Sequence, residues 1–372
     1  MIDPKAFVDQ LAEQGIDFYA GVPDSLLKDF CAYVDDHGKL GQHVITANEG
    51  NAVAMASGYH MATGKSAVVY LQNSGLGNTI NPLTSIADKE VYQTPMLLVV
   101  GWRGEPGVKD EPQHIKQGRI TPEQLDLLEI PYQVVSAESV PRELARWSRE
   151  RLDETGAPVA LLVKKGAFAS YKSQRKPGTD ATLKREAALD LLLALAGDAA
   201  IVSTTGKTSR EVFELRVARG EHQRDFLTVG GMGHTASIAL GAAMGQPGKR
   251  VVCIDGDGSA LMHLGALPII GSLQPGNLTH VLLNNSAHES VGGQPTVADR
   301  TDFRAIALAC GYNAYAVAST PEDLNAAWQR LSGEPSPVML EVRITTGSRS
   351  DLGRPTSTPR ENKQAFMDWL RR

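Results

Sequence analysis

The stretch that decides the fold covers residues 251–285 and reads VVCIDGDGSALMHLGALPIIGSLQPGNLTHVLLNN. It contains two apolar runs, residues 251–254 and 281–283, which have the length and composition of buried strands. The first run leads into Gly256-Asp257-Gly258, the second ends at Asn284-Asn285, and a helix-like segment lies between them. We therefore predict two strands of one α/β sheet whose polar ends meet at the same edge.

These two strand ends carry the ligands that a hard cation prefers. Mg²⁺ is held in proteins by carboxylates, carbonyl oxygens and the phosphate oxygens of a bound substrate or cofactor. Asp257 and the side chain of Asn285 would supply the protein ligands, and the glycines would let the backbone approach phosphate closely. A lone Gly-Asp-Gly is also a common turn, so the prediction depends on its combination with the Asn-Asn strand end.

Length and composition indicate a globular enzyme of two domains. The chain has 372 residues, of which 42% are hydrophobic and 21% charged. The net charge is -5 and the basic residues are scattered, so we expect no nucleic-acid partner. No apolar run has the length of a membrane span, and the N-terminus resembles an acidic amphipathic helix rather than a signal peptide. Three separated cysteines, Cys31, Cys253 and Cys310, favour reduced, packed thiols in a cytoplasmic protein.

The first half of the chain alternates predicted helices and strands. A helix is expected at residues 4–14, and Asp24 or Ser25 is expected to cap a second helix. A long polar loop is expected at residues 101–119. Strands are expected at residues 16–20, 44–47, 67–71, 96–100 and 158–163.

The second half repeats the pattern of the first. A basic segment with Pro and Gly, residues 170–182, is interpreted as a linker between domains at 1–169 and 183–372. After it we expect a helix at 183–196, strands at 199–203 and 338–344, and a helix at 234–245. EGNAVAMASGYHMATGKSAVVYLQNSG matches GHTASIALGAAMGQPGKRVVCIDGDG at an offset of about 183 residues. The sequence therefore predicts a duplicated α/β domain. The two strand ends, which finish in Gln-Asn-Ser-Gly and Gly-Asp-Gly, are expected to have different functions.

Further polar clusters follow predicted strands, and each has two interpretations. Glu49 is either a buried carboxylate at the sheet edge or a surface residue of a capping turn. Met232, between glycines, is either a core residue or part of a ligand site. The run from Thr204 to Ser209 suits an anion at a helix N-terminus, but it lacks the second glycine of a phosphate-binding P-loop and also fits an ordinary helix cap. The loop with Arg103, Lys109 and His114 is either functional or solvated.

These motifs resemble those of thiamine diphosphate enzymes, namely Glu49 in NEG, Met232 in GGMGH, Asp257 in GDG and Asn285 in NN. The resemblance covers nearly the whole chain. It implies two similar α/β domains, each a mostly parallel sheet flanked by helices, with no middle domain. The first would bind the pyrimidine of thiamine diphosphate, and the second would bind its diphosphate and Mg²⁺.

The resemblance also implies roles for individual residues. Glu49 would be hydrogen-bonded to N1′ of the aminopyrimidine, and Met232 would support the cofactor in its bent shape. Asp257, Asn285 and the backbone carbonyl of Ala287 would hold the metal. The remaining candidates for cofactor binding are Asn73, Thr205, Gly206, Gly231, Gly256, Gly258 and Ser259.

A narrower similarity is to phosphonopyruvate decarboxylases, and many motifs are similar in sulfopyruvate decarboxylases. It is carried by GVPDSLLKDF, ITANEGNAVAMASGYH, QNSGLGNTINPL, GWRGEPGVKDEPQHIKQG and NNSAHESVGGQPT. It implies decarboxylation of an anionic 2-oxo acid, 3-phosphonopyruvate, in phosphonate biosynthesis. The alternatives are sulfopyruvate or another anionic 2-oxo acid as substrate, or a non-catalytic thiamine diphosphate-binding subunit.

The same similarity supplies the remaining site residues and the assembly. The expected catalytic group comprises Glu49, Asp24, Ser25, His114 and His288. Because a phosphonate dianion needs several donors, Arg103, Lys109, Gln113 and Lys207 are the candidates for substrate binding. A homo-oligomer is implied, at least a dimer with active sites shared between subunits.

Overall fold

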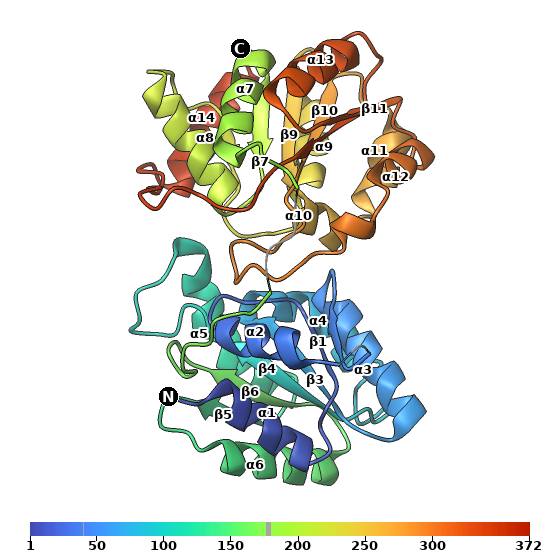
Figure 1. The fold of residues 1–372 in the computed structure, drawn as a ribbon, viewed down its shortest axis with the longest axis vertical. Coiled ribbons are helices and arrows are strands. Elements are labelled where there is room, and N and C mark those ends of the chain that lie inside the picture. The colour runs from blue at the N-terminus through green and yellow to red at the C-terminus, as the bar shows by residue number, and fades with distance from the viewer. Residues whose placement is uncertain (40, 176–179) are drawn as a thin grey trace. The chain divides into compact units, whose positions relative to one another are not determined.

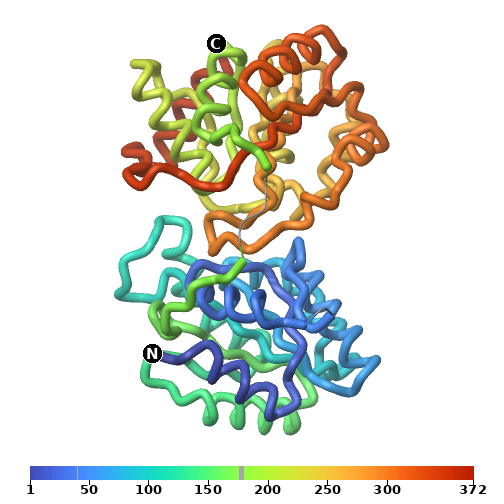
Figure 2. Tube along the Cα trace, in the orientation of Figure 1, coloured from blue at the N-terminus to red at the C-terminus, as the bar shows by residue number. Residues whose placement is uncertain are grey.

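The computed structural model describes every residue except 40 and 176–179. The chain divides into two compact units, one of residues 1–176 and 290–294 and the other of residues 177–289 and 295–372. Each unit contains one six-stranded sheet with helices on both faces (Figures 1 and 2). The division between residues 176 and 177 falls within the predicted linker, of which residues 176–179 lie outside the described part, so the proposed domain bounds stay a prediction.

The first unit alternates strands and helices along its sequence. Its strand order is β2-β1-β3-β4-β6-β5, and all neighbouring strands are parallel. The strands are β1 (Tyr19–Gly21), β2 (His43–Ile45), β3 (Ala67–Gln72), β4 (Met96–Gly101), β5 (Tyr132–Val135) and β6 (Val159–Val163). The helices are α1 (Pro4–Glu13), α2 (Lys28–His37), α3 (Glu49–Thr63), α4 (Leu76–Thr84), α5 (Pro112–Leu127) and α6 (Pro141–Thr155), with a short 3₁₀ turn at Asn73–Gly75.

The second unit is built in the same way. Its strand order is β11-β12-β10-β9-β7-β8, again with parallel neighbours. The strands are β7 (Ala200–Ser203), β8 (Phe226–Leu227), β9 (Val251–Gly256), β10 (Leu278–Asn284), β11 (Ala314–Ala318) and β12 (Val338–Arg343). The helices are α7 (Arg185–Ala196), α8 (Lys207–Ala218), α9 (Thr235–Gly245), α10 (Asp257–Met262), α11 (Ala266–Leu273), α12 (Phe303–Ala309), α13 (Pro321–Ser332) and α14 (Pro359–Leu370).

The strand orders confirm the predicted duplication. Read from its other edge, the second sheet runs β8-β7-β9-β10-β12-β11, which repeats the first sheet strand for strand. The strand that ends at Gly-Asp-Gly, β9, therefore corresponds to β3, and the loop after β8 corresponds to the loop that leads from β2 to Glu49. In both sheets the chain changes direction between the first and third strands, and in such α/β sheets ligands bind at the carboxyl ends of those strands.

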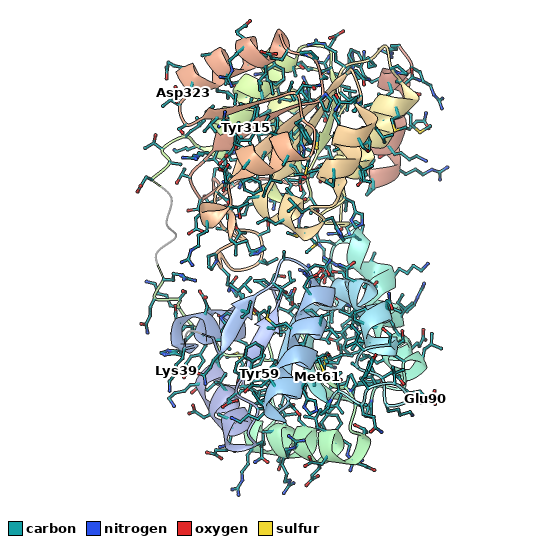
Figure 3. All side chains as sticks on the ribbon, turned by 90° about the vertical axis from the view of Figure 1, so that its right-hand side faces the viewer. Lys39, Tyr59, Met61, Glu90, Tyr315 and Asp323 are labelled. Atoms are coloured by element: carbon teal, nitrogen blue, oxygen red, sulfur yellow. The ribbon has the colours of Figure 1, made fainter. Side chains whose placement is uncertain are left out.

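Each sheet is buried on both faces. In the first unit one apolar cluster packs α1, α2 and α6 on the sheet, and the other packs α3, α4 and α5. In the second unit α7, α8 and α13 cover one face, and α9, α11, α12 and α14 cover the other. Apolar side chains fill the space between each sheet and its helices (Figure 3). Among the described residues, none of these four clusters draws members from both units.

Two local predictions were wrong. Helix α2 begins at Lys28, and Leu27 rather than Asp24 or Ser25 is its N-cap. Asp24 instead accepts a hydrogen bond from the backbone of Leu26 at 3.1 Å, in the turn that precedes the helix. The loop predicted to extend to residue 119 ends at Pro112, because proline is favoured in the first turn of a helix and α5 begins there.

None of the described helices is long and apolar enough to span a membrane.

Candidate active site

Glu49 is a buried carboxyl at the carboxyl edge of the first sheet. Asn48 caps α3 by accepting a hydrogen bond from the backbone of Gly50 at 2.8 Å, which places Glu49 in the first helical turn. The side chain of Glu49 is only 5% exposed, and its Oε2 accepts a hydrogen bond from Asn78 Nδ2 at 2.8 Å. Burial raises the pKa of Glu49. It is therefore not the surface residue of the alternative interpretation but a carboxyl that can hold a proton.

Gly75 is required by this arrangement. A Cβ atom at this position would lie 2.3 Å from Glu49 Oε1, so any side chain there would displace the carboxyl. The neighbouring Asn73 has no exposed surface. Its amide donates to the Arg103 carbonyl at 2.8 Å and to Thr121 Oγ1 at 2.9 Å. Asn73 thus fixes the segment after β4, and its predicted contact with a cofactor stays a prediction.

Asp24 is the second buried carboxyl in this unit, and it lies where β1 and β3 end. It has no exposed surface and accepts a hydrogen bond from Gln72 Nε2 at 2.7 Å. Burial raises the pKa of Asp24, although Gln72 and Arg103 oppose that shift. A Cβ at Gly101 would come within 2.0 Å of Asp24 Oδ2, so β4 must also end in glycine. The sequence alone did not identify Gln72 as the partner of this carboxyl.

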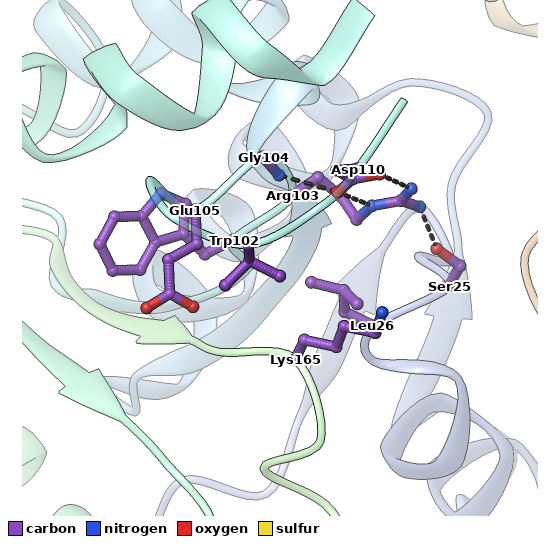
Figure 4. Close-up of a pocket in the computed structure, with 9 residues that line it drawn as sticks. Ser25, Leu26, Trp102, Arg103, Gly104, Glu105, Asp110 and Lys165 are labelled. Atoms are coloured by element: carbon purple, nitrogen blue, oxygen red, sulfur yellow. Dashed lines mark hydrogen bonds and ion pairs between the residues drawn. The ribbon is translucent and has the colours of Figure 1, made fainter. Parts of the chain in front are cut away.

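Arg103 is held by side chains of its own unit (Figure 4). Its Nε donates to Asp110 Oδ2 at 2.8 Å, its Nη2 donates to the other oxygen of Asp110, and its Nη1 donates to Ser25 Oγ at 2.7 Å. Burial alone would raise the pKa of Asp110, but the guanidinium and backbone N–H groups outweigh burial and hold that pKa well below its usual range. These contacts border a cavity of about 210 Å³ lined by Ser25, Trp102, Arg103, Glu105, Asp110 and Lys165.

The other predicted residues of this loop lie near the start of α5. His114 is buried, and burial and the nearby Arg103 lower the pKa of His114 to about 4, so its imidazole is neutral at neutral pH. Gln113 Nε2 lies 3.5 Å from His114 Nε2, and Lys109 is exposed. Gly104 packs against the His114 backbone, where a Cβ would lie 1.9 Å from the carbonyl oxygen.

In the second unit Asp257 begins α10 at the end of β9. It is 3% exposed, and Thr296 Oγ1 donates to its Oδ2 at 2.5 Å. Burial raises the pKa of Asp257 to about 6, against the effect of hydrogen bonds from Thr296 and from backbone N–H groups that include that of Asn285. The ends of β9 and β10 therefore meet, as the sequence predicted.

The two asparagines at the end of β10 have different hydrogen-bond partners. Asn284 donates to Glu341 Oε1 at 2.9 Å and accepts from the backbone of Ser286 at 3.1 Å. Tyr315 on β11, labelled in Figure 3, donates to the other oxygen of Glu341. In Asn285 the amide nitrogen donates to Glu289 at 3.1 Å, and Oδ1 accepts only the N–H of Ala287, at 3.1 Å, among the described residues. The carboxamide oxygen of Asn285 therefore retains acceptor capacity for a ligand.

Three loops meet beside Asp257. The Gly230 N–H donates to Thr205 Oγ1 at 3.2 Å, and the Gly233 N–H donates to Ser259 Oγ at 3.2 Å. Gly206, Gly230, Gly231 and Gly233 all have positive φ angles, which glycine adopts without strain. Met232 is half-buried within this glycine-rich segment. The segments with Thr205, Met232 and Ser259 thus converge at the edge where Asp257 lies.

His288 lies directly against Gly258. A Cβ at Gly258 would come 3.2 Å from His288 Nδ1 and Cε1, so glycine leaves room for the imidazole ring. His288 is buried, and burial lowers the pKa of His288 to about 4. Ala287, whose carbonyl is a predicted metal ligand, forms a β-bridge with Pro295.

Lys207 is not free in this structure. Its Nζ donates to Glu289 Oε1 at 2.9 Å, and Arg185 donates to the other oxygen of Glu289 at 2.5 Å. Burial alone would raise the pKa of Glu289, but Arg185 and Lys207 outweigh burial and lower it. Sequence analysis missed Arg185, which precedes Glu289 by 104 positions and carries no local motif.

A second group of potential metal ligands lies inside the sheet rather than at its edge. Ligand atoms of Cys253, Asp255 and His280 lie within 4.8 Å of one another, and all three residues are buried. Asp255 Oδ2 is 3.7 Å from His280 Nε2, and neither atom has a hydrogen-bond partner among the described residues. His280 Nδ1 lies 2.9 Å from the Tyr312 hydroxyl. Cys253 and His280 are paired residues on the neighbouring strands β9 and β10, and Asp255 lies two positions after Cys253.

Both units match sequence families of known cofactor chemistry. Residues 4–127 match the thiamine pyrophosphate enzyme N-terminal TPP binding domain, and residues 204–342 match the corresponding C-terminal TPP binding domain. The chain belongs to the thiamine pyrophosphate enzymes. Thiamine pyrophosphate is the same compound as thiamine diphosphate, so the family predicted from the motifs is confirmed.

Full-length relatives of this thiamine pyrophosphate enzyme are decarboxylases. Phosphonopyruvate decarboxylase of Streptomyces viridochromogenes is 37% identical, covering 100% of this chain and 95% of the relative. Phosphonopyruvate decarboxylase of Streptomyces hygroscopicus is 35% identical, covering 99% of this chain and 94% of the relative. Sulfopyruvate decarboxylase of Methanosarcina acetivorans is 26% identical, covering 100% of this chain and 98% of the relative.

The second unit fits the metal that thiamine pyrophosphate enzymes use with their cofactor. Hydrogen-bond donors to Asp257 in the described part of the chain are a hydroxyl and backbone N–H groups, none of which is charged. A buried carboxylate without a cationic partner is costly, and a divalent cation would neutralise it. Asn285 offers a carboxamide oxygen at the end of the neighbouring strand, and carboxylate and amide oxygens are ligand types that Mg²⁺ accepts.

We expect Asp257→Asn to stabilise the cofactor-free thiamine pyrophosphate enzyme at neutral pH. The folded pKa of about 6 lies above the ordinary aspartate value of 3.8, so ionised Asp257 opposes folding by roughly 3 kcal/mol. This cost is fully present above the folded pKa and disappears as the pH falls through about 6 towards 4. Urea unfolding of the metal-free wild type and of Asp257→Asn, at neutral pH and near pH 4, measures this cost as the difference in the free energy of unfolding.

The exposed Asp299→Asn serves as the matched control, and it should leave the free energy of unfolding near that of the wild type. An Asp257→Asn protein that is less stable than the wild type at neutral pH would contradict the expected burial cost.

Proposed function

We propose that this thiamine diphosphate enzyme decarboxylates 3-phosphonopyruvate to phosphonoacetaldehyde and CO₂ with Mg²⁺, as a carboxy-lyase of phosphonate biosynthesis. The observation that carries the proposal is its identity of 37% and 35% to two phosphonopyruvate decarboxylases along essentially the whole chain. The sulfopyruvate decarboxylase of similar coverage is 26% identical. The carboxyls at the two sheet edges, Glu49 and Asp257, support the proposal chemically.

When bound, thiamine diphosphate supplies the electron sink that accepts the bonding pair left as CO₂ departs. Asp257 and Asn285 would hold Mg²⁺, and the carbonyl of Ala287 is the third protein ligand that we propose. Glu49 would hold a proton on its carboxyl and exchange it with the aminopyrimidine, for which its burial and raised pKa are suited.

A proton must replace CO₂ on the carbon that loses it. Asp24 is a candidate donor because burial raises its pKa, and a carboxyl with a raised pKa keeps its proton closer to neutral pH. His114 and His288 are candidates to move protons as neutral imidazoles. Ser25 would act through the hydrogen bond that it accepts from Arg103.

The substrate anion would be bound by the polar loop and the start of α5. Arg103 retains two N–H groups beyond its contacts with Asp110 and Ser25, and it borders the cavity in Figure 4. Lys109 and Gln113 are further donors, and Lys207 is the cation at the start of α8. Several charge-assisted donors are what a phosphonate dianion requires.

The single test is a comparison of kcat/KM for CO₂ release from phosphonopyruvate, sulfopyruvate and pyruvate. A sulfonate carries one charge fewer than a phosphonate dianion, so losing one charge-assisted hydrogen bond should lower kcat/KM for sulfopyruvate by roughly 10- to 100-fold. Pyruvate, which has no second anionic group, should be poorer still. A preference for sulfopyruvate would identify the alternative substrate, and no CO₂ release from any 2-oxo acid would favour a non-catalytic cofactor-binding subunit.

We further propose a cytoplasmic homo-oligomer, at least a dimer, in which subunits share active sites. Free cysteines, two of them buried, favour a reducing compartment. The oligomer follows from the resemblance to thiamine diphosphate enzymes, whose two cofactor-binding domains pair between subunits.

A further inference from the structure

Glu289 accepts four hydrogen bonds in the second unit. Its Oε2 accepts from Asn285 Nδ2 at 3.1 Å and from Arg185 Nη1 at 2.5 Å. Its Oε1 accepts from Lys207 Nζ at 2.9 Å and from the Gly347 N–H at 3.1 Å. One carboxylate therefore connects the end of β10 with the starts of α7 and α8 and with the segment after β12.

Arg185 anchors this carboxylate from the interior. It is 5% exposed, and Glu211, which is 1% exposed, accepts from its Nε at 2.6 Å and its Nη2 at 2.9 Å. A bidentate pair fixes the plane of the guanidinium, so the third nitrogen meets Glu289 in a set direction. Two cations, Arg185 and Lys207, balance the two carboxylates of Glu211 and Glu289.

The amide of Asn285 can satisfy its contacts in only one orientation. Its Nδ2 donates to the Glu289 carboxylate, and its Oδ1 accepts from the Ala287 N–H. Rotating the carboxamide by half a turn would place Oδ1 against the carboxylate and the amide N–H groups against another N–H, so both contacts would become repulsive. The carboxamide oxygen is thereby kept on the side of the amide away from Glu289.

We propose that Glu289 is a positioning residue that orients the Asn285 carboxamide oxygen for the metal ion. The inference rests on the proposed role of Asp257 and Asn285 in Mg²⁺ binding. Mg²⁺ demands near-octahedral geometry, so the direction of each oxygen ligand matters to its affinity. Hydrogen bonds to the far side of a metal ligand orient it and tune its binding.

A purely structural role for Glu289 predicts a different effect of its removal on Mg²⁺ affinity. If the carboxylate only joins loops, its loss would lower the stability of the protein, and any effect on Mg²⁺ binding would occur whether or not Asn285 is present. If it acts through Asn285, its loss should have no further effect on Mg²⁺ affinity once the Asn285 side chain has been removed.

The experiment is a double-mutant cycle on the full-length protein. Mg²⁺ is titrated at saturating thiamine diphosphate by calorimetry, without substrate, into the wild type, Glu289→Ala, Asn285→Ala and the double variant. We expect Glu289→Ala to weaken Mg²⁺ binding by about 10- to 100-fold. The double variant should bind Mg²⁺ as Asn285→Ala does. Glu214→Ala is the matched control, since Glu214 also pairs with an arginine of this unit without contacting Asn285, and it should bind Mg²⁺ like the wild type.

Glu289→Asp covers the case in which Glu289→Ala does not fold. This variant keeps the negative charge that Arg185 and Lys207 require, but its side chain is one methylene shorter, so its carboxylate lies farther from Asn285. Its Mg²⁺ affinity should therefore fall between those of the wild type and Asn285→Ala. Wild-type affinity in the folded Glu289 variant, or effects that multiply in the double variant, would overturn the inference. A wild-type protein that binds no Mg²⁺ with thiamine diphosphate would overturn the proposed cofactor function as well.

Discussion

Glu49→Gln is expected to lower the rate of CO₂ release by about 10²- to 10⁴-fold while thiamine diphosphate binding stays near that of the wild type. The reason is the environment of the carboxyl, which is buried, has a raised pKa and is bonded to Asn78. Glutamine has nearly the same shape, so the protein should fold, but it cannot exchange a proton with the cofactor. Single-turnover CO₂ release and calorimetric titration of thiamine diphosphate measure the two effects separately.

A matched control for this variant is Glu90→Gln, which neutralises an exposed carboxylate of the same unit and should leave both measurements unchanged. Wild-type turnover by Glu49→Gln would refute the role of Glu49. Loss of cofactor binding together with activity would instead show that the carboxyl acts mainly in binding.

Asp257→Ala is expected to weaken binding of Mg²⁺ and of thiamine diphosphate together. Removing a partner of a metal ligand already costs about 10- to 100-fold in metal affinity, so removing a carboxylate ligand should cost about 100-fold or more. If Asp257 holds the metal beside the diphosphate as we propose, neither ligand should bind tightly without the other. Calorimetric titration of each ligand at a saturating concentration of the other measures this coupling.

Asp299→Ala removes an exposed carboxylate of the same unit and should leave both affinities unchanged. If Asp257→Ala retained the Mg²⁺ affinity of the wild type, Asp257 would not be a metal ligand, and the metal would have to bind at another site. The contrast with Glu49→Gln is useful, since one variant should bind the cofactor without turnover and the other should fail to bind it.

Much of the fold could be predicted because buried parallel strands have a strong pattern. Five predicted strands agree with β3, β4, β6, β7 and β12 to within a residue or so at each end. Strand β5 was missed because it is an edge strand with Gln133 and Val134 exposed, so its four residues show no continuous apolar run. The duplication was visible in sequence because the same helix-turn-strand unit recurs, and the repeated strand order confirms it.

Less of the candidate site could be predicted, for a physical reason. Asp257 follows β9 directly and Glu49 lies shortly after β2, so both were candidates as residues near strand ends, where α/β sheets hold ligands, and the family resemblance gave each a proposed role. Their partners Asn78 and Thr296 lie 29 and 39 positions away, and only the folded chain brings them together. Arg103 also pairs with Asp110 of the same loop, a contact that the sequence analysis did not predict for this candidate substrate-binding arginine.

The confinement of each of the four hydrophobic clusters of described residues to one unit has a consequence for how such a protein can be encoded. Among the described residues, a break in the polypeptide between Phe168 and Leu183 would divide none of these four hydrophobic clusters. Among the relatives are sulfopyruvate decarboxylase α and β subunits, each of which matches only about half of this chain. Joining the two halves in one polypeptide supplies them in equal number and at a high effective concentration.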